Sequence, residues 1–311
     1  MRWRRASAAL LAAAAFGGCS TGDDEAAAPE PGTSVEGGWT QVASMSQRRS
    51  YIAAAQVDRD IYAAGGMVGE TGRPLATFAR YDTSRDRWET LRPLPVATRA
   101  AAAAAVGGVV YVIGGTTPQG NTRAVWAWDG SGWRERAPMP AARFNHAAVA
   151  LDGRIWVLGG YEGGREHADV FVFDPQADLW RRSAPLPRPT HAFGAVAFGR
   201  ELWVIGGRRG ESILREVWTY APGRERGWRR GPDLAEAMEL LGAAVVEDEI
   251  HAVWEHVYQI YDAAEGRWRQ GPRPLVTRHG LEVFAAGGAL YTVGGCTTAL
   301  RDSPIVERLE L

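Results

Sequence analysis

Short runs of β-branched and aromatic residues recur along the chain, and five of them end at two consecutive glycines. These diglycines are Gly65-Gly66, Gly114-Gly115, Gly159-Gly160, Gly206-Gly207 and Gly294-Gly295. The first four are spaced by roughly 45 to 49 residues, and the last interval spans two such periods. Branched and aromatic side chains fit a pleated, buried surface, so the runs predict one core β-strand in each repeat.

Each period contains three further strand signals. A stretch of small residues, such as 100–106 or 147–151, precedes the diglycine run, and an aromatic stretch that ends in Asp, such as 78–82, follows it. The Asp side chain favours a turn by accepting hydrogen bonds from the backbone just after it. A tryptophan then opens the last strand of each repeat, and these residues are Trp39, Trp88, Trp133, Trp180, Trp228 and Trp268. Six tryptophans predict six repeats.

Four short antiparallel strands per repeat would form one blade, and a ring of blades leaves few sheet edges exposed. The diglycine run, the Tyr-Asp pair and the Trp followed by Leu or Met and Pro resemble kelch repeats throughout residues 39–311. The resemblance implies an all-β, six-bladed kelch-type β-propeller. The last repeat ends near 306–309 without a tryptophan strand, so the strand at Trp39 is expected to complete the sixth blade.

The first 38 residues are expected to lie outside the propeller. Arg2, Arg4 and Arg5 precede an apolar stretch at 6–16 and the segment Phe16-Gly17-Gly18-Cys19. This arrangement resembles a bacterial lipoprotein signal, which implies that 1–18 is removed and that Cys19 carries lipid. The alternative is a plain signal peptide with an incidental cysteine. Residues 19–38 are expected to be a flexible tether. The protein is expected to be exported and to reside in the cell envelope.

The charge composition argues against one class of partner, nucleic acids. The formal net charge is -1, and all 35 basic residues are arginine, so there is no electrostatic case for nucleic-acid binding. No cofactor or metal motif is present, and membrane contact is expected only through the lipid at Cys19. Cys296, the second cysteine, is expected to be a small buried residue.

Arginines recur in the loops that join one blade to the next. They are Arg48, Arg49, Arg99, Arg143, Arg188 and Arg278. These loops open on the same face as the loops between the second and third strands, which is the face that usually carries the site in the kelch family. A ring of guanidinium groups there would bind a carboxylate, an acidic sugar or an acidic peptide. Alternatively, the arginines brace adjacent loops.

The fifth repeat breaks the pattern. Its diglycine is replaced within the segment 251–256, and the next strand begins at once. Local failures of a repeated rule are expected at functional or strained sites, so Glu239, Trp254, Glu255 and His256 are candidate ligand-binding residues. The carboxylates and His256 would supply acid or base groups facing the arginines. The alternative is a blade that has drifted without a functional purpose.

Two functions remain open from these observations. The first is a non-enzymatic module that binds a protein, a peptide or a glycan through the loop face of the propeller. The second is a carbohydrate isomerase similar to the six-bladed kelch sialic-acid mutarotases. Its arginines would hold the sugar carboxylate, while Glu239, Glu255 or His256 would move the proton.

Overall fold

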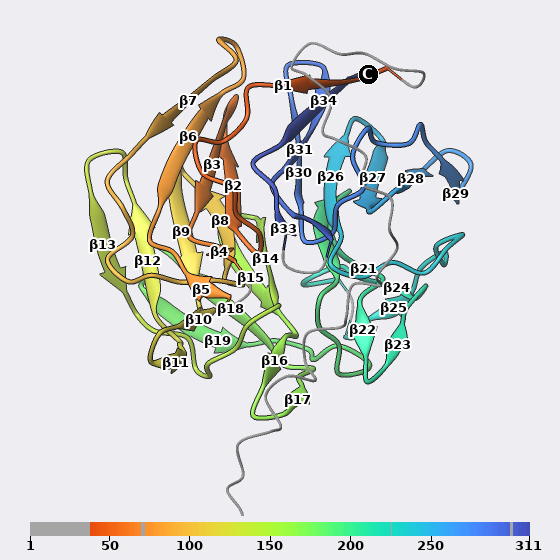
Figure 1. The fold of residues 1–311 in the computed structure, drawn as a ribbon. Coiled ribbons are helices and arrows are strands. Elements are labelled where there is room, and N and C mark those ends of the chain that lie inside the picture. Colours follow the sequence, from red (N-terminus) through yellow and green to blue (C-terminus); the bar gives the residue numbers. More distant parts are fainter. Residues whose placement is uncertain (1–37, 70–71, 225, 299–300) are drawn as a thin grey trace, which may run out of the picture.

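The computed structural model describes residues 38–69, 72–224, 226–298 and 301–311, and it confirms the six-bladed propeller (Figure 1). Six four-stranded antiparallel sheets form the blades. Blade one contains β2 (Ala53–Val57), β3 (Asp60–Ala64), β6 (Phe78–Asp82) and β7 (Arg87–Thr90). Blade two contains β8 (Ala102–Val106), β9 (Val109–Ile113), β12 (Val125–Trp128) and β13 (Trp133–Arg136). Blade three contains β14 (Ala147–Leu151), β15 (Arg154–Leu158), β18 (Val170–Asp174) and β19 (Leu179–Arg182).

The second half of the ring repeats the arrangement. Blade four contains β20 (Gly194–Phe198), β21 (Glu201–Ile205), β24 (Val217–Tyr220) and β25 (Arg229–Arg230). Blade five contains β26 (Gly242–Val246), β27 (Glu249–Trp254), β28 (Val257–Asp262) and β29 (Arg267–Gln270). Blade six contains β30 (Glu282–Ala286), β31 (Ala289–Val293), β34 (Val306–Glu310) and, as its outer strand, β1 (Trp39–Val42). The predicted closure is confirmed, because β1 pairs antiparallel with β34 and places Trp39 opposite Leu309.

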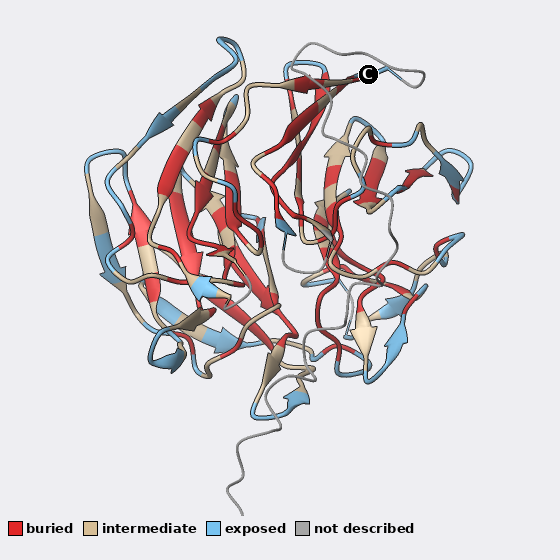
Figure 2. Ribbon diagram, in the orientation of Figure 1, coloured by how far each residue is buried: buried red, intermediate tan, exposed pale blue. Residues whose placement is uncertain are grey.

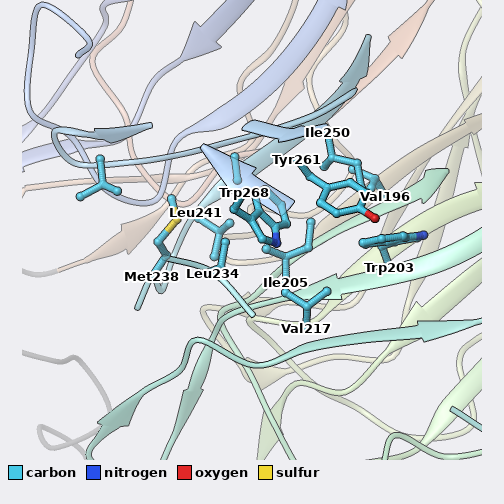
Figure 3. Packing of buried hydrophobic residues seen from close by; sticks show 12 residues of the cluster. Val196, Trp203, Ile205, Val217, Leu234, Met238, Leu241, Ile250, Tyr261 and Trp268 are labelled. Atoms are coloured by element: carbon cyan, nitrogen blue, oxygen red, sulfur yellow. The ribbon is translucent and has the colours of Figure 1, made fainter. Parts of the chain in front are cut away.

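The core lies between neighbouring blades. The cluster in Figure 3 combines Trp203 and Ile205 of blade four with Ile250, Tyr261 and Trp268 of blade five. Figure 2 shows long buried stretches on the middle strands of the blades, such as β15 and β18, and exposed residues on outer strands such as β7 and β13. Burial of apolar area between blades is therefore the main force that joins them.

The six tryptophans also form a ring of hydrogen bonds. Each indole Nε1 donates to the carbonyl oxygen four residues after the tryptophan of the preceding blade, at 2.8 to 3.1 Å. Trp88, for example, bonds Ala43, and Trp39 closes the circle by bonding Pro272. The recurrence of tryptophan along the chain thus has a direct geometric cause.

A second ring surrounds the central axis where each inner strand begins. Its six residues adopt positive φ, and they are Tyr51, Ala100, Asn145, Ala192, Leu240 and Gly280. Five successive N–H groups, from Ala100 to Gly280, donate to the carbonyl of the preceding member at 2.7 to 3.1 Å. We call this ring the collar. Its bonds are made by the main chain, so the collar does not depend on the side chains at these positions.

The second glycine of a diglycine allows a close approach between blades. Gly66 has a φ of 97°, and a Cβ added there would lie 2.7 Å from Ser50 O, which no larger residue would tolerate. Its N–H donates to Thr98 O at 2.9 Å. Blade five keeps the equivalent bond without glycine, because Glu255, with a φ of 52°, donates to Arg278 O at 2.7 Å.

Candidate functional site

Five blades raise a two-stranded β-ribbon on one face, built from the loop between their second and third strands. The ribbons are β4 (Met67–Val68) with β5 (Arg73–Pro74), β10 (Thr116–Thr117) with β11 (Gly120–Asn121), β16 (Tyr161–Glu162) with β17 (Arg165–Glu166), β22 (Arg208–Arg209) with β23 (Ser212–Ile213), and β32 (Cys296–Thr298) with β33 (Arg301–Asp302). We call this side the ribbon face; β16 and β17 project from it at the bottom of Figure 1.

Blade five has no ribbon. Trp254 pairs directly with Val257, which leaves a hairpin of only two residues, as the sequence predicted. His256 is exposed at its tip, whereas Trp254 is half-buried and packs against the core between blades four and five. The hairpin keeps its backbone bond to the loop before blade six, so blade five is shortened without being detached from the ring.

Three of the predicted binding arginines are structural. Arg49, Arg143 and Arg278 are 0 to 1% exposed, and each Nη1 donates to the carbonyl of the glycine 16 residues later. Burial lowers the pKa of Arg49 to about 10. The expectation of an open ring of guanidinium groups is therefore corrected for these three, because they are buried and donate to groups within the propeller, in Arg278 also to the carboxylate of Glu307. The bracing interpretation accounts for them.

Arg99 lies one position out of register with that set. Thr98 occupies the bracing position in blade two, and its carbonyl oxygen accepts from Gly66. Arg99 is half-buried, and its Nη1 contacts Met67 Sδ at 3.4 Å. Its side chain thus packs against the ribbon of blade one instead of standing clear of the surface.

The predicted acid and base groups of blade five do not converge on the buried arginines. Glu239 pairs with Arg208 at 2.8 Å in a contact that involves both carboxylate oxygens. Glu255 instead lies 3.9 Å from the ring Nδ1 of His279. Glu239 therefore links the ribbon of blade four to the loop that leads into blade five, and it does not stand beside Glu255 as an acid–base pair.

Other carboxylates connect neighbouring ribbons in the same way. Asp302 on the ribbon of blade six accepts hydrogen bonds from Ser50 and from Gly69 N at the blade one ribbon. Glu166 on blade three accepts from Gly210 N of blade four at 2.7 Å. These contacts fix the ribbons of blades six and one, and those of blades three and four, against each other, so this rim of the ribbon face is preorganised.

A different set of arginines is exposed on this face, and the sequence reasoning did not single it out. Arg73 lies on β5, Arg123 just after β11 and Arg165 on β17, so the three stand on consecutive blades. Within the described residues, none of them forms an ion pair or donates a side-chain hydrogen bond. All three lie between the diglycine and the third strand of their repeat, and this shared position in the sequence could have identified them as a set.

The central channel is lined by the inner strands of all six blades. A wide segment of about 370 Å³ is surrounded mostly by alanine and valine, and a narrower one of about 80 Å³ passes through the collar. Glu282, a residue that the sequence reasoning missed, lines both segments. No arginine is among the described residues that line them, so the channel does not provide the carboxylate-and-arginine pair expected of a mutarotase-like site.

Two buried histidines are held neutral. Burial and the nearby Arg143 lower the pKa of His146 to about 3, and burial lowers the pKa of His251 to about 4. The described part of the chain contains no group of three or more His, Cys, Asp or Glu residues placed to hold a metal ion. No helix among the described residues is long and apolar enough to cross a membrane. Cys19 and the rest of 1–37 lie outside the described residues.

Comparisons with known proteins agree with the repeat pattern. The family model "KLHDC2/KLHL20/DRC7 Kelch-repeats domain" matches residues 51–233, which is more than half of the chain. Human Kelch-like protein 34 is 39% identical over 88 residues, which are 28% of this chain and 13% of that protein. Beta-scruin of Limulus polyphemus is 33% identical over 79 residues, 25% of this chain and 8% of that protein.

Kelch-like protein 15 of Gallus gallus is 30% identical over 93 residues, 30% of this chain and 19% of that protein. The matched segments thus span less than a fifth of the length of these relatives, so the likeness concerns the repeats. The family match covers blades one to four, from β2 to β25, and blades five and six continue the same four-stranded arrangement. The protein belongs to the Kelch-repeat family.

Proposed function

We propose that this propeller is a non-catalytic binding module that recognises an acidic segment of a partner protein on its ribbon face. The observation that carries the proposal is the set of exposed arginines, Arg73, Arg123 and Arg165, on or next to three consecutive ribbons, which have no acidic partner among the described residues. The planar fork of a guanidinium group binds carboxylates in a bidentate geometry, which gives both attraction and specificity.

Two features of the rim favour binding over catalysis. The carboxylates that link the ribbons, such as Glu166 and Glu239, are already occupied by hydrogen bonds or ion pairs. They fix the ribbons in place, which lowers the conformational entropy lost when a partner binds. Loops on a rigid scaffold that present unsatisfied charges are typical of recognition surfaces.

The test is a triple variant, Arg73→Gln, Arg123→Gln and Arg165→Gln. With fluorescent peptides rich in Glu and Asp, we expect it to raise Kd roughly tenfold or more and to weaken the salt dependence of binding. The control carries Arg59→Gln, Arg87→Gln and Arg181→Gln, which are exposed away from the ribbons. Equal affinities of the two triple variants would refute the proposal. Selective loss of binding to uronic-acid oligosaccharides, with no peptide binding at low salt, would transfer the site to an acidic glycan.

We further propose that the protein is exported and anchored in the cell envelope by lipid on Cys19. The support is the sequence around Phe16-Gly17-Gly18-Cys19, which resembles a lipoprotein signal. In a bacterial host fed an alkyne-labelled fatty acid, the full chain should become labelled and sediment with membranes. Cys19→Ala should abolish the labelling. Labelling that persists in this variant would contradict the proposed site.

A further inference from the structure

One carboxylate, that of Glu282, lies in a channel whose lining is mostly apolar. In register, Glu282 is the first residue of the inner strand of blade six, where it pairs with Val293. The equivalent first residues of the other five inner strands are Ala53, Ala102, Ala147, Gly194 and Gly242. A position that needs a small residue in five blades therefore carries a long acidic one in the sixth.

Glu282 has no side-chain partner in the part of the chain that the structure describes. No hydrogen bond or ion pair joins its carboxylate to any of the described residues. Glu282 is half-buried on the channel wall, and the surrounding protein raises its pKa to about 8 because it reduces the hydration of the ionised carboxylate. Tyr51 and His146 are the other titratable groups that line the channel, both at the collar end, and His146 stays neutral because its pKa is about 3.

The surroundings select one class of ligand. A hard metal ion needs several oxygen ligands. The described side chains that line the wide segment offer only two oxygen-bearing groups, the carboxylate of Glu282 and the amide of Gln56, which are too few for such an ion. An aliphatic ammonium ion needs fewer polar groups than a metal ion. One carboxylate balances its charge, and the alanine side chains contact its hydrocarbon part.

We propose that the central channel is a binding site for a small aliphatic ammonium ion, with Glu282 as its counter-charge. The ligand enters the wide segment, toward the face that carries the turns between first and second strands, because the collar narrows the ribbon side to about 80 Å³. This site is separate from the ribbon arginines and binds a cation instead of an acidic group.

The experiment titrates n-butylammonium chloride into the protein at pH 9 and follows Kd by calorimetry and the melting temperature Tm by scanning fluorimetry. Uncharged n-butanol and KCl at equal ionic strength are the ligand controls. We expect butylammonium to raise Tm, with a Kd that increases roughly tenfold or more in Glu282→Gln and in Glu282→Ala. Glu282→Ala recreates the residue found in three other blades, so a folded variant is expected. Glu135→Gln, at an exposed position on the outer strand of blade two, should bind as the unmodified protein does.

The pH dependence supplies a second readout. The pKa of Glu282 in the folded protein lies above its ordinary value of 4.5, so the unmodified protein loses stability relative to Glu282→Gln as pH rises from about 4.5 to 8. Butylammonium should reduce that loss. Binding of equal strength in the unmodified protein and both Glu282 variants, or the same effect from n-butanol, would overturn the proposal. Neither result bears on the ribbon arginines, whose variants leave the channel unchanged.

Discussion

Truncation of the chain through Ala43 is expected to lower the melting temperature by roughly 10 °C or more. The deletion removes β1, exposes the edge of β34 and leaves blade six with three strands. It also removes Trp39, whose side chain is 0% exposed and packs edge-on against Tyr258 with ring centroids 5.8 Å apart. Scanning calorimetry of the truncated and full chains measures the change.

The point variant Trp39→Ala separates the indole from the strand. Loss of a buried Trp side chain typically costs about 3 to 5 kcal/mol, so this variant alone should account for much of the drop. Trp133→Ala is the matched control, because Trp133 makes the equivalent indole bond at 3.0 Å but is only partly buried. Its effect should be smaller. An unchanged midpoint after truncation would mean that β1 does not close the ring in solution.

Glu307→Gln is expected to reduce the free energy of unfolding by about 3 to 5 kcal/mol. The Glu307 carboxylate is 0% exposed, pairs with Arg278 and accepts a hydrogen bond from Val276 N at 2.9 Å. The variant keeps the shape of the side chain but leaves the Arg278 guanidinium as an uncompensated buried charge. Urea denaturation gives the change in unfolding free energy.

Two controls identify the cause. Glu89→Gln breaks an exposed ion pair with Arg80 and should change stability by no more than about 0.5 kcal/mol. The double variant Arg278→Met, Glu307→Leu removes both charges and should recover part of the loss, because apolar residues of similar volume replace a buried pair well. If Glu307→Gln were as mild as Glu89→Gln, the ion pair would not anchor the closing blade.

The fold was predictable because its determinants repeat. A tryptophan at each period makes the same indole bond at each blade boundary, so the spacing of Trp39, Trp88 and the rest reports the ring directly. The closure followed from the phase of the repeat. The ribbons were expected only as loops, since two-residue strands such as β10 carry too little pattern to be read from sequence.

The site was harder to predict, because residue type does not reveal where a side chain points. Arg49 and Arg73 are both arginines near the same face, yet the first is buried under carbonyls and the second is exposed. The recurring interval of 16 residues between a bracing arginine and its glycine was a signal for structure. An alignment of the six inner strands in register would have shown Glu282 as the one acidic residue at a position that is otherwise Ala or Gly.

The boundary between two blades is held by donors from both sides. The later blade donates through its indole at the rim, and the earlier blade donates through the second glycine N–H, as Trp133 and Gly66 do at the boundary between blades one and two. This redundancy means that one blade can diverge without opening the ring. Blade five has done so, since Glu255 preserves the main-chain bond after the glycine and the ribbon have gone. The propeller can thus vary its surface one blade at a time while its circular framework persists.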